Sequence, residues 1–338
     1  MFQANKDAIL RAILAAGLPP LAAEEASVLV EAWVDTWAEQ DAENWTIEAS
    51  EMPFYLWLDA EKTALCIGVS DLRGRDAEGG FHAEWKSATP PKPRARWGEE
   101  SWIADLSNGP QLAVYGLAQR EGRFLDAVVR PNETLIVPGW IDGERTETAP
   151  RLFVRVCLKS SPPAFWPSTG GVFQVQFDHA GLNRVKAALL NEARAIQARR
   201  RTEGLPWMYP GNQCTNKYGR VCDSYEDCKT GKYPPIEKDH RFSSSDPGGQ
   251  VLEHVQRLHP ESFESPDLVI LSASAYSDAQ QCPELYRRRN LCRQPKEESY
   301  ALNVGRGMHA GLAELYTQVR EWQQNPPSQI ALDTDLTL

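Results

Sequence analysis

Three charged residues between Gly68 and Lys86 have the types and the spacing of a site that hydrolyses phosphodiester bonds. Asp71 lies in one strand-like stretch, and Glu84-Trp85-Lys86 lies in the next. Because side chains alternate along a strand, Glu84 and Lys86 project from one face, and Asp71 joins them if the two strands form a hairpin. Two neighbouring carboxylates suit Mg²⁺ or Mn²⁺, and a lysine beside them can stabilise an anionic transition state. The pattern therefore indicates metal-assisted hydrolysis.

The stretch that follows is predicted to be a helix, and it carries two further polar residues. In QLAVYGLAQR (111–120), Gln111 and Tyr115 are four residues apart, so they share one helix face and can point to one groove. An E-x-K pattern alone is usually a solvated strand face with alternating charge. The combination of G-x-x-D, E-x-K and Q-x-x-x-Y in this order is more specific, and it favours a catalytic site.

This order of motifs resembles the PD-(D/E)xK nuclease superfamily, and within it the RecB-type nuclease domains. By that resemblance Asp71 and Glu84 are metal ligands, and Lys86 is the catalytic lysine. Gln111 and Tyr115 would form the supporting helix motif. The resemblance implies an α/β fold with a mixed central sheet of the restriction-endonuclease-like type, flanked by helices and joined to a helical lobe and a cysteine-ligated metal centre.

The C-terminal part of the chain carries the motifs with which RecB-type domains often begin. Those domains open with S-x-S, a helix, a Cys-Pro pair, a basic stretch and G-x-x-x-H. Here Ser272 and Ser274 form the S-x-S, and G-x-x-x-H runs from Gly305 to His309. Placing residues 267–338 before the N-terminus restores the family order, so the chain resembles a circularly permuted nuclease whose metal site is completed by His309. Permutation is tolerated where the original termini lie close together on the surface.

Two other interpretations of the C-terminal segment stay open. His309 could be an ordinary helix histidine, or the segment could belong to a second domain or complete a neighbouring molecule by swapping. Several motif elements in the family order favour the metal ligand. The same resemblance suggests Glu51 as a further acidic residue, since the family often has a glutamate on the strand before the G-x-x-D motif.

Three closely spaced cysteines predict a second metal site. Cys214, Cys222 and Cys228 follow the pattern C-x7-C-x5-C in a loop-rich stretch, which favours metal ligation over core packing. Cys282 would be the fourth ligand, with Cys292 as the reserve candidate. The arrangement resembles the iron–sulfur nucleases of the superfamily, in which a [4Fe–4S] cluster connects the two ends of the domain. Zn²⁺ is the alternative, because four thiolates suit it equally well.

The remaining elements are coarser predictions. Helices are expected at residues 6–16, 21–42, 179–201 and 305–322 with a short one around 249–259, and strands at 52–59, 64–74, 81–88 and 151–160, the third after a turn at Gly79-Gly80. The expected organisation is a nuclease core over 1–228 (helical lobe 1–45, catalytic sheet and helices 46–203, three-cysteine loop 204–228), a linker over 229–266, and 267–338 as the permuted first segment of the same domain.

Composition sets broader bounds. The chain of 338 residues is 42% hydrophobic and 9% aromatic, enough for one large core or two modest ones. Neither a bilayer-spanning run nor a signal peptide is recognised, so a cytoplasmic location is expected, and seven cysteines there favour free thiols or metal ligands. Cys66 and Cys157, on apolar strands, are expected to be buried. The net charge of −10 argues against a passive nucleic-acid coat.

Contact with DNA is expected from three basic stretches beside these motifs, at residues 92–96, 198–201 and 286–290. Phosphate binding by such patches is electrostatic and independent of base sequence, although each patch alone is more often a solvated surface. Four aromatic residues could stack on bases, with core packing as the alternative for most of them: Trp85, Trp97, Trp102 and Tyr115.

The expected protein is a Mg²⁺- or Mn²⁺-dependent deoxyribonuclease, by family analogy an exonuclease on single-stranded DNA ends. The sequence contains no G-x-x-x-x-G-K-[ST] loop for ATP, so a helicase or recombination partner would be a separate chain. The alternative is a non-catalytic nucleic-acid-binding protein that keeps a zinc or iron–sulfur centre. The intact Asp71, Glu84 and Lys86 favour the enzyme.

Overall fold

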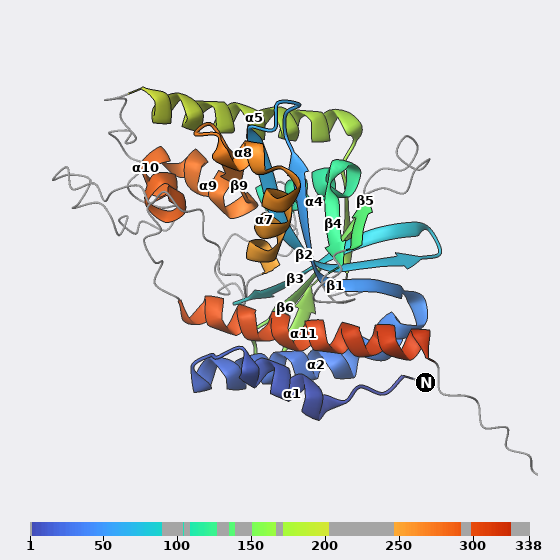
Figure 1. The fold of residues 1–338 in the computed structure, drawn as a ribbon. Coiled ribbons are helices and arrows are strands. Elements are labelled where there is room, and N and C mark those ends of the chain that lie inside the picture. Colours follow the sequence, from blue (N-terminus) through green and yellow to red (C-terminus); the bar gives the residue numbers. More distant parts are fainter. Residues whose placement is uncertain are drawn as a thin grey trace, which may run out of the picture.

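A computed structural model of the chain has a mixed β-sheet with helices packed on it (Figure 1). The structure describes residues 2–89, 104, 109–126, 135–138, 151–166, 172–202, 247–291 and 299–325. Within these residues nine strands form one open sheet, which confirms the predicted α/β class with a mixed central sheet and flanking helices. Among the described helices, none combines the length and the apolar character that crossing a membrane requires.

The centre of the sheet is an antiparallel meander with parallel strands beside it. β1 (Thr46–Trp57), β2 (Ala64–Asp76) and β3 (Gly79–Ala88) pair in their order along the chain. β6 (Arg151–Leu158) pairs in parallel with β3, and β9 (Val269–Leu271) pairs in parallel with the first residues of β2. The pairing of β9 builds the C-terminal part of the chain directly into the sheet.

Shorter strands extend the sheet on both sides: β4 (Arg123–Asp126), β5 (Leu135–Pro138), β7 (Ala164–Trp166) and β8 (Phe173–Gln176). The turn between β2 and β3 lies at residues 77–78, so the turn expected at Gly79-Gly80 is displaced and both glycines begin β3. Gly79 has a φ of +121°, a conformation that residues with a Cβ atom rarely adopt.

Three helices form the predicted helical lobe on one face of the sheet (Figure 1). They are α1 (Lys6–Ala15), α2 (Pro20–Asn44) and α11 (Tyr300–Gln324). The helices confirm those expected in these regions. Their apolar sides pack with Trp33 and Tyr316 in the centre, and both side chains are fully buried. Because α11 lies against α2 and the sheet, the lobe contains helices from both the N-terminal and the C-terminal parts of the chain.

Two glycines allow α11 to approach the other lobe helices closely. A Cβ atom on Gly307 would lie 2.6 Å from Ala26 Cβ, and one on Gly311 would lie 3.0 Å from Ile13. Both distances are shorter than an ordinary van der Waals contact, so these positions favour glycine despite its low helix propensity. The two glycines, one turn apart, therefore define the face that α11 turns toward α1 and α2.

A buried charged network joins α2, β6 and α11. The Arg155 guanidinium donates to both carboxylate oxygens of Asp41, at 2.8 and 3.1 Å, and the Tyr316 hydroxyl donates to Asp41 Oδ2 at 2.6 Å. Tryptophan rings surround the guanidinium, and the ring centroid of Trp37 lies 4.3 Å from Arg155 Cζ. Since a buried charge is costly without its partner, the network contributes strongly to the position of the lobe on the sheet.

The other face of the sheet is covered by α4 (Pro110–Glu121), α5 (His179–Arg201) and α9 (Ala273–Gln281). α5 has the bounds that the sequence predicts. Its first turn is capped by the side chain of Asp178, a residue type whose carboxylate satisfies the free N–H groups of a helix start. The residues of β6 alternate between this core and the lobe core, so the strand is buried on both faces.

After α9 the chain turns at Cys282 into α10 (Pro283–Tyr286) and a π-helical turn, η2 (Arg287–Leu291). The side chains of Tyr286 and Leu291 are buried in the same core as α4, α5 and α9. The basic stretch of the C-terminal segment is therefore part of a folded element.

Two helices fill the described part of the segment that was expected to be a linker. α7 (Pro247–Leu258) is the short helix predicted there, and α8 (Pro260–Glu264) follows it. Val251 and Val255 of α7 pack with Tyr55 and Leu65 of the sheet. This part of the segment therefore adds to the hydrophobic core and does not only connect its neighbours.

The described ends of the chain lie side by side on the helical lobe. The rings of Phe2 and Trp322 are in edge-to-face contact, with centroids 5.8 Å apart. The backbone N–H of Asn5 donates to Gln318 Oε1 at 2.8 Å. The two terminal residues themselves lie outside the described residues. Because residues 2 and 322 are in contact, a chain that joined the two described ends directly would need only a short connection, as a circular permutation requires.

Candidate active site

The strands β2 and β3 separate where the acidic residues lie. Their pairing ends at Leu72 and Ala83, while β3 continues in register with β6. Beyond this point Asp71 Oδ2 accepts a hydrogen bond from the backbone N–H of Trp85 at 2.6 Å. The Asp71 carboxylate thus occupies the fork between the strands. A side chain in this position can face a ligand, because the ladder no longer covers it.

A β-bulge in β1 brings Glu51 opposite Asp71. The register between β1 and β2 shifts by one residue between Ile47 and Ala49, and the pairs on either side of Glu51 place it across from Asp71. Without that extra residue, Glu51 would face a different position, since bulges redirect the side chains that follow them. Glu51 also has a φ of +47°, which is uncommon for a residue with a side chain and is concentrated at functional sites.

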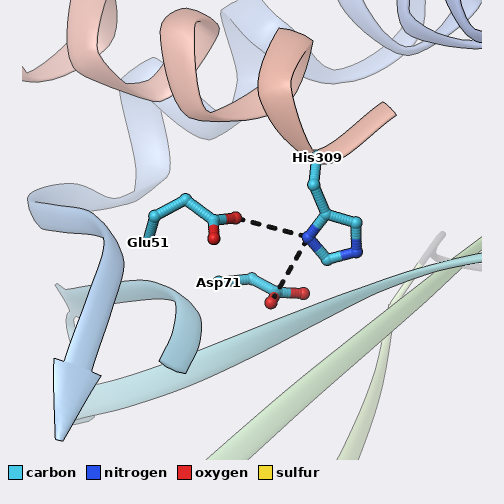
Figure 2. Close-up of side chains that lie close together, drawn as sticks. All are labelled: Glu51, Asp71 and His309. Carbon is cyan, nitrogen blue, oxygen red and sulfur yellow. Dashed lines mark hydrogen bonds and ion pairs between the residues drawn. The ribbon is translucent and has the colours of Figure 1, made fainter. Parts of the chain in front are cut away.

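His309 reaches this pair of carboxylates from α11 (Figure 2). Its Nδ1 atom lies 3.3 Å from Glu51 Oε1 and 3.5 Å from Asp71 Oδ1. His309 is two residues from both Gly307 and Gly311, a rotation of about 200° around the helix, so it lies on the opposite side from the glycines. The close packing of the glycines on the lobe therefore directs His309 toward the sheet.

Glu51, Asp71 and His309 form the candidate metal-ligand group of the described residues. Each offers one ligand atom, and the three atoms lie within 4.8 Å of one another. Burial raises the pKa of Asp71. Burial opposes the charged form of His309, but Asp71 and Glu51 outweigh it and raise the pKa of the imidazole to about 10. The group therefore favours a positive charge at its centre.

A second network connects Glu84 and Lys86 to α4. Lys86 Nζ is paired with Glu84 Oε1 and donates to Gln111 Oε1 at 2.9 Å. Gln111 Nε2 donates to Glu84 Oε1 at 2.8 Å and to the Tyr115 hydroxyl at 2.9 Å. Burial acts to lower the pKa of Lys86, but the carboxylates of Glu84 and Asp71 raise it above its ordinary value. The lysine is therefore an ammonium ion at neutral pH.

One carboxylate oxygen of Glu84, Oε2, is buried and has no hydrogen-bond partner among the described residues. Burial, and next the charge of Asp71, raise the pKa of Glu84 to about 7. A buried acceptor without a donor is costly, and native proteins rarely leave one unless a ligand or water uses it. This oxygen, together with two carboxylates and an imidazole nearby, fits a small divalent cation.

The structure brings the predicted site residues into one region but changes their grouping. The expected ligands were His309, Asp71 and Glu84. The atoms that lie close together belong to His309, Asp71 and Glu51, while Glu84 is bonded to Lys86 and Gln111. The sequence signal for Glu51 was its position before the G-x-x-D motif. The bulge that places it opposite Asp71 has no clear signal in the sequence.

The predicted cysteine centre is described only at Cys282. This residue is half-buried at the junction of α9 and α10. The other proposed ligands and the reserve candidate lie outside the described residues: Cys214, Cys222, Cys228 and Cys292. Cys66 and Cys157 are fully buried on β2 and β6, as predicted, and burial raises the pKa of both thiols to about 12.

The basic stretch at 286–290 was expected to contact DNA, and for its first arginines this expectation is wrong. Arg287 and Arg288 are buried and both are paired with Glu284, while Arg289 is paired with Asp278 at 2.6 Å. The guanidinium groups of Arg287 and Arg288 are used inside the fold, because a buried arginine requires a carboxylate. Local charge in the sequence did not reveal that acidic partners would face them.

Two arginines of the basic stretch at 198–201 contact the residues before β9, and one of them, Arg201, remains exposed. Arg200 donates to the carbonyl oxygen of Leu268 at 2.6 Å, and Arg201 is paired with Asp267. The end of α5 is therefore tied to the residues before β9. The third stretch, residues 92–96, lies outside the described residues.

The two described aromatic residues that were considered for base stacking are buried. Trp85 is 1% exposed and packs among Trp33, Trp45 and Tyr316, so it is a core residue and cannot stack on a base. The Tyr115 side chain is buried beside Gln111 and Phe54. The other two candidates, Trp97 and Trp102, lie outside the described residues.

Comparison with known proteins returned no matching family model, no matching curated protein and no matching solved structure. The fold and the side chains define an α/β protein with an open mixed sheet and an acidic–histidine group at a strand fork.

Proposed function

We propose that the protein is a metal-dependent deoxyribonuclease that hydrolyses phosphodiester bonds, with single-stranded DNA ends as its substrate. The observation that carries the proposal is the group of Glu51, Asp71 and His309, whose ligand atoms lie within 4.8 Å of one another next to the Glu84–Lys86 pair. Two acidic oxygens, an imidazole nitrogen and an ammonium ion are the equipment that cleavage of a phosphodiester requires.

The ligand group has the chemistry of a Mg²⁺ or Mn²⁺ site. Carboxylate oxygens suit both ions, and Mn²⁺ also accepts imidazole. A divalent ion bound there would polarise a phosphate oxygen and make a water molecule more acidic. The His309 imidazole must be neutral to bind it, because a metal ligand needs a free electron pair. Glu84 Oε2, which has no hydrogen-bond partner among the described residues, is available to the same ion or to its water.

Lys86 would stabilise the charge that develops on the phosphate. Its ammonium group is held by Glu84 Oε1 and by Gln111 Oε1 at 2.9 Å. A donor that is already oriented loses little in reorganisation when negative charge appears, and such groups are worth several kcal/mol in transition-state stabilisation, typically about 2.7–4 kcal/mol. Gln111 is in turn held by the Tyr115 hydroxyl at 2.9 Å, so both residues act by positioning Lys86 and Glu84.

The arrangement of the chain also supports the proposed circular permutation. The segment that would have opened an unpermuted domain supplies β9, which pairs with β2, and α11, which carries His309. The two described ends lie against each other through Phe2 and Trp322. We propose that residues 267–338 belong to the same nuclease domain as the catalytic strands. The proposed site needs this segment, because α11 supplies His309.

A cysteine-ligated centre is a separate part of the proposal. Cys214, Cys222 and Cys228 would bind a [4Fe–4S] cluster together with Cys282, and Zn²⁺ is the alternative. A cluster is expected to stabilise the fold more than the chemistry, because it connects distant segments. Iron, zinc and sulfide analysis of protein purified without oxygen tests this, and protein that contains neither metal would refute it.

A cleavage assay tests the nuclease directly. Labelled single- and double-stranded DNA are incubated with Mg²⁺, Mn²⁺, Ca²⁺ or EDTA. Cleavage is expected with the first two ions only, because Ca²⁺ prefers longer bonds and more ligands. Asp71→Asn should abolish it, whereas Glu61→Gln, which removes an exposed carboxylate outside the site, should not. Cleavage in excess EDTA would contradict the mechanism. DNA binding without cleavage would favour a non-catalytic binding protein.

A further inference from the structure

A cleft of about 520 Å³ opens on one side of Lys86. It is lined by residues 67–69 of β2, the first turns of α4 and the first turns of α9, together with Lys86 of β3 and Val154 of β6. Lys86 and Gln111 belong both to this lining and to the network around Glu84. The cleft therefore adjoins the proposed catalytic lysine, which is also paired with Glu84.

Hydroxyl groups from α9 form one wall of the cleft. Ser272 caps the helix by accepting the N–H of Ala275 at 3.1 Å, and its hydroxyl lies 2.9 Å from that of Ser274. Ser274 and Ser277 are three residues apart on the helix, both are exposed, and both line the cleft. The S-x-S motif of the sequence thus has a position in the structure beside Lys86.

The cleft is attractive to an anion. The protein carries a net charge of −10, yet the described residues that line the cleft include one lysine and no aspartate or glutamate. The N-terminal ends of α4 and α9 both border it, and a helix carries partial positive charge at this end. An ammonium group, exposed hydroxyls and two helix starts in one concave space are suited to a phosphate group.

The rest of the lining is mostly apolar. Val69, Pro110 and Ala273 contribute surfaces of this type. The volume lies within the range of about 300–1,000 Å³ that small-molecule sites usually have. Such a space can hold a sugar and a base beside their phosphate, whereas a base that is still paired to a second strand could not enter.

We infer that this cleft binds one nucleotide of a single DNA strand, next to the phosphodiester that is cleaved. Lys86 and the serine hydroxyls would contact the phosphate, and the apolar wall would contact the sugar and the base. The inference rests on the proposed nuclease function and gives it a specificity, because only an unpaired nucleotide fits. Lys86 lines the cleft and also interacts electrostatically with Asp71 of the metal-ligand group, so the reacting phosphate would lie beside the lysine.

A charge introduced at Ser274 tests the inference. Ser274 is the second residue of α9, where an acidic side chain stabilises the helix, so Ser274→Asp should not lower the melting temperature. In the cleft the same carboxylate would repel a phosphate. Binding of a fluorescein-labelled oligothymidylate, measured by anisotropy in Ca²⁺ so that no cleavage occurs, should weaken by about tenfold or more, since opposed like charges are strongly unfavourable.

Ala301→Asp is the matched control. It adds the same charge at the second residue of α11, at an exposed position outside the described lining of the cleft. Its affinity for the oligothymidylate should stay within about twofold of the wild type, well short of the loss of about tenfold expected for Ser274→Asp. Ser277→Trp should also weaken binding, because an indole at that exposed position would fill the cleft without adding charge.

The outcomes separate this inference from the nuclease proposal. If the wild type cleaves DNA but Ser274→Asp and Ser277→Trp bind the oligothymidylate normally, the cleft inference is wrong and the nuclease stands. Equal weakening by Ser274→Asp and Ala301→Asp would also overturn it, since the effect would then be general repulsion. If both cleft variants lose binding selectively but the wild type does not cleave, the cleft inference stands and the nuclease proposal fails.

Discussion

His309 and Glu51 are 258 positions apart in the sequence, yet His309 Nδ1 lies 3.3 Å from Glu51 Oε1. The contact joins α11 to β1, and Asp71 of β2 completes the group. α11 therefore supplies the imidazole of the group, and the strands supply its two carboxylates. If the group binds a metal ion, neither the strands nor α11 would form the site alone.

Removing His309 should weaken metal binding. We expect His309→Ala to reduce the affinity for Mn²⁺ by at least about tenfold, because even the loss of a residue that only orients a ligand typically costs about 10–100-fold. Isothermal titration with MnCl₂ measures it. His179→Gln changes an exposed histidine at the start of α5 and should leave the affinity unchanged. Wild-type Mn²⁺ affinity in His309→Ala would show that the imidazole is not a ligand.

Removing the ammonium group of Lys86 should impair turnover and spare metal binding. Lys86→Met keeps a long side chain, and we expect DNA cleavage to fall about 100- to 1,000-fold, the usual effect of losing one preorganised stabilising group. Lys186→Met is the control. It removes a lysine outside the site, whose Nζ atom lies 2.5 Å from Glu121 Oε2. Near-normal turnover of Lys86→Met would place the catalytic charge elsewhere.

The network of Asp41, Arg155 and Tyr316 should be a main contributor to stability. Asp41→Asn removes the carboxylate that faces a buried guanidinium, and we expect the free energy of unfolding in urea to fall by about 3–5 kcal/mol. Tyr316→Phe removes one donor from the same carboxylate and the acceptor of the Trp33 indole N–H, and should cost less, about 1–3 kcal/mol. Equal losses in the two variants would mean that the ion pair adds little beyond the hydrogen bonds of Tyr316.

Two glycines of α11 should respond to alanine in opposite directions. A Cβ atom at Gly307 would lie 2.6 Å from Ala26 Cβ, so Gly307→Ala should destabilise the protein by about 1–3 kcal/mol. At Gly305 the nearest atom, Ser87 Oγ, would be 3.8 Å away, so Gly305→Ala should stabilise the helix by about 0.5–1 kcal/mol. Thermal unfolding of both variants checks this. A stabilised Gly307→Ala would contradict the close packing of the lobe.

The pairing of Asp76 with Arg151 should depend on pH. Arg151 donates to both oxygens of Asp76 at 2.7 Å, which lowers the pKa of that carboxyl. The stabilisation is therefore present above the ordinary pKa of an aspartate and is lost as the pH falls through the lowered value. Asp76→Asn should cost about 0.2–1 kcal/mol at pH 7, and the difference should shrink in strong acid.

Glu78 provides the matched comparison for this pair. Its carboxylate is 74% exposed and lies 3.2 Å from Arg151, so Glu78→Gln should change the stability less than Asp76→Asn at neutral pH. Urea unfolding at neutral and at acid pH measures both. A difference for Asp76→Asn that persists unchanged in strong acid would show that the ion pair is not its cause.

Local patterns predicted the elements that carry the site. Alternation along a strand placed Glu84 and Lys86 on one face, and the two side chains are paired in the structure. The spacing of Gln111 and Tyr115 placed both on one side of a helix, where they are hydrogen-bonded. α5 has its predicted bounds. These features depend on neighbours within a few residues, so they are readable from a single sequence.

Other features depend on partners that are distant in the chain. The arginines of the 286–290 stretch looked like a phosphate-binding surface, but Arg287 and Arg288 are buried against Glu284, and Arg289 pairs with Asp278. β9 was too short to stand out, and it is a strand because β2 offers it hydrogen bonds. The partners of these arginines and of the β9 backbone depend on which segments of the chain pack together. Composition and local charge do not show this.

The sequence by itself determined the candidate side chains, namely Asp71, Glu84, Lys86 and His309, because their types and spacing are chemical properties of short segments. The tertiary structure decided which of them lie together. A one-residue bulge in β1 turned Glu51 toward Asp71, and the close packing of α11 on the lobe directed His309 to the same place. Register and helix rotation result from the packing of whole elements, so no local pattern could have predicted them.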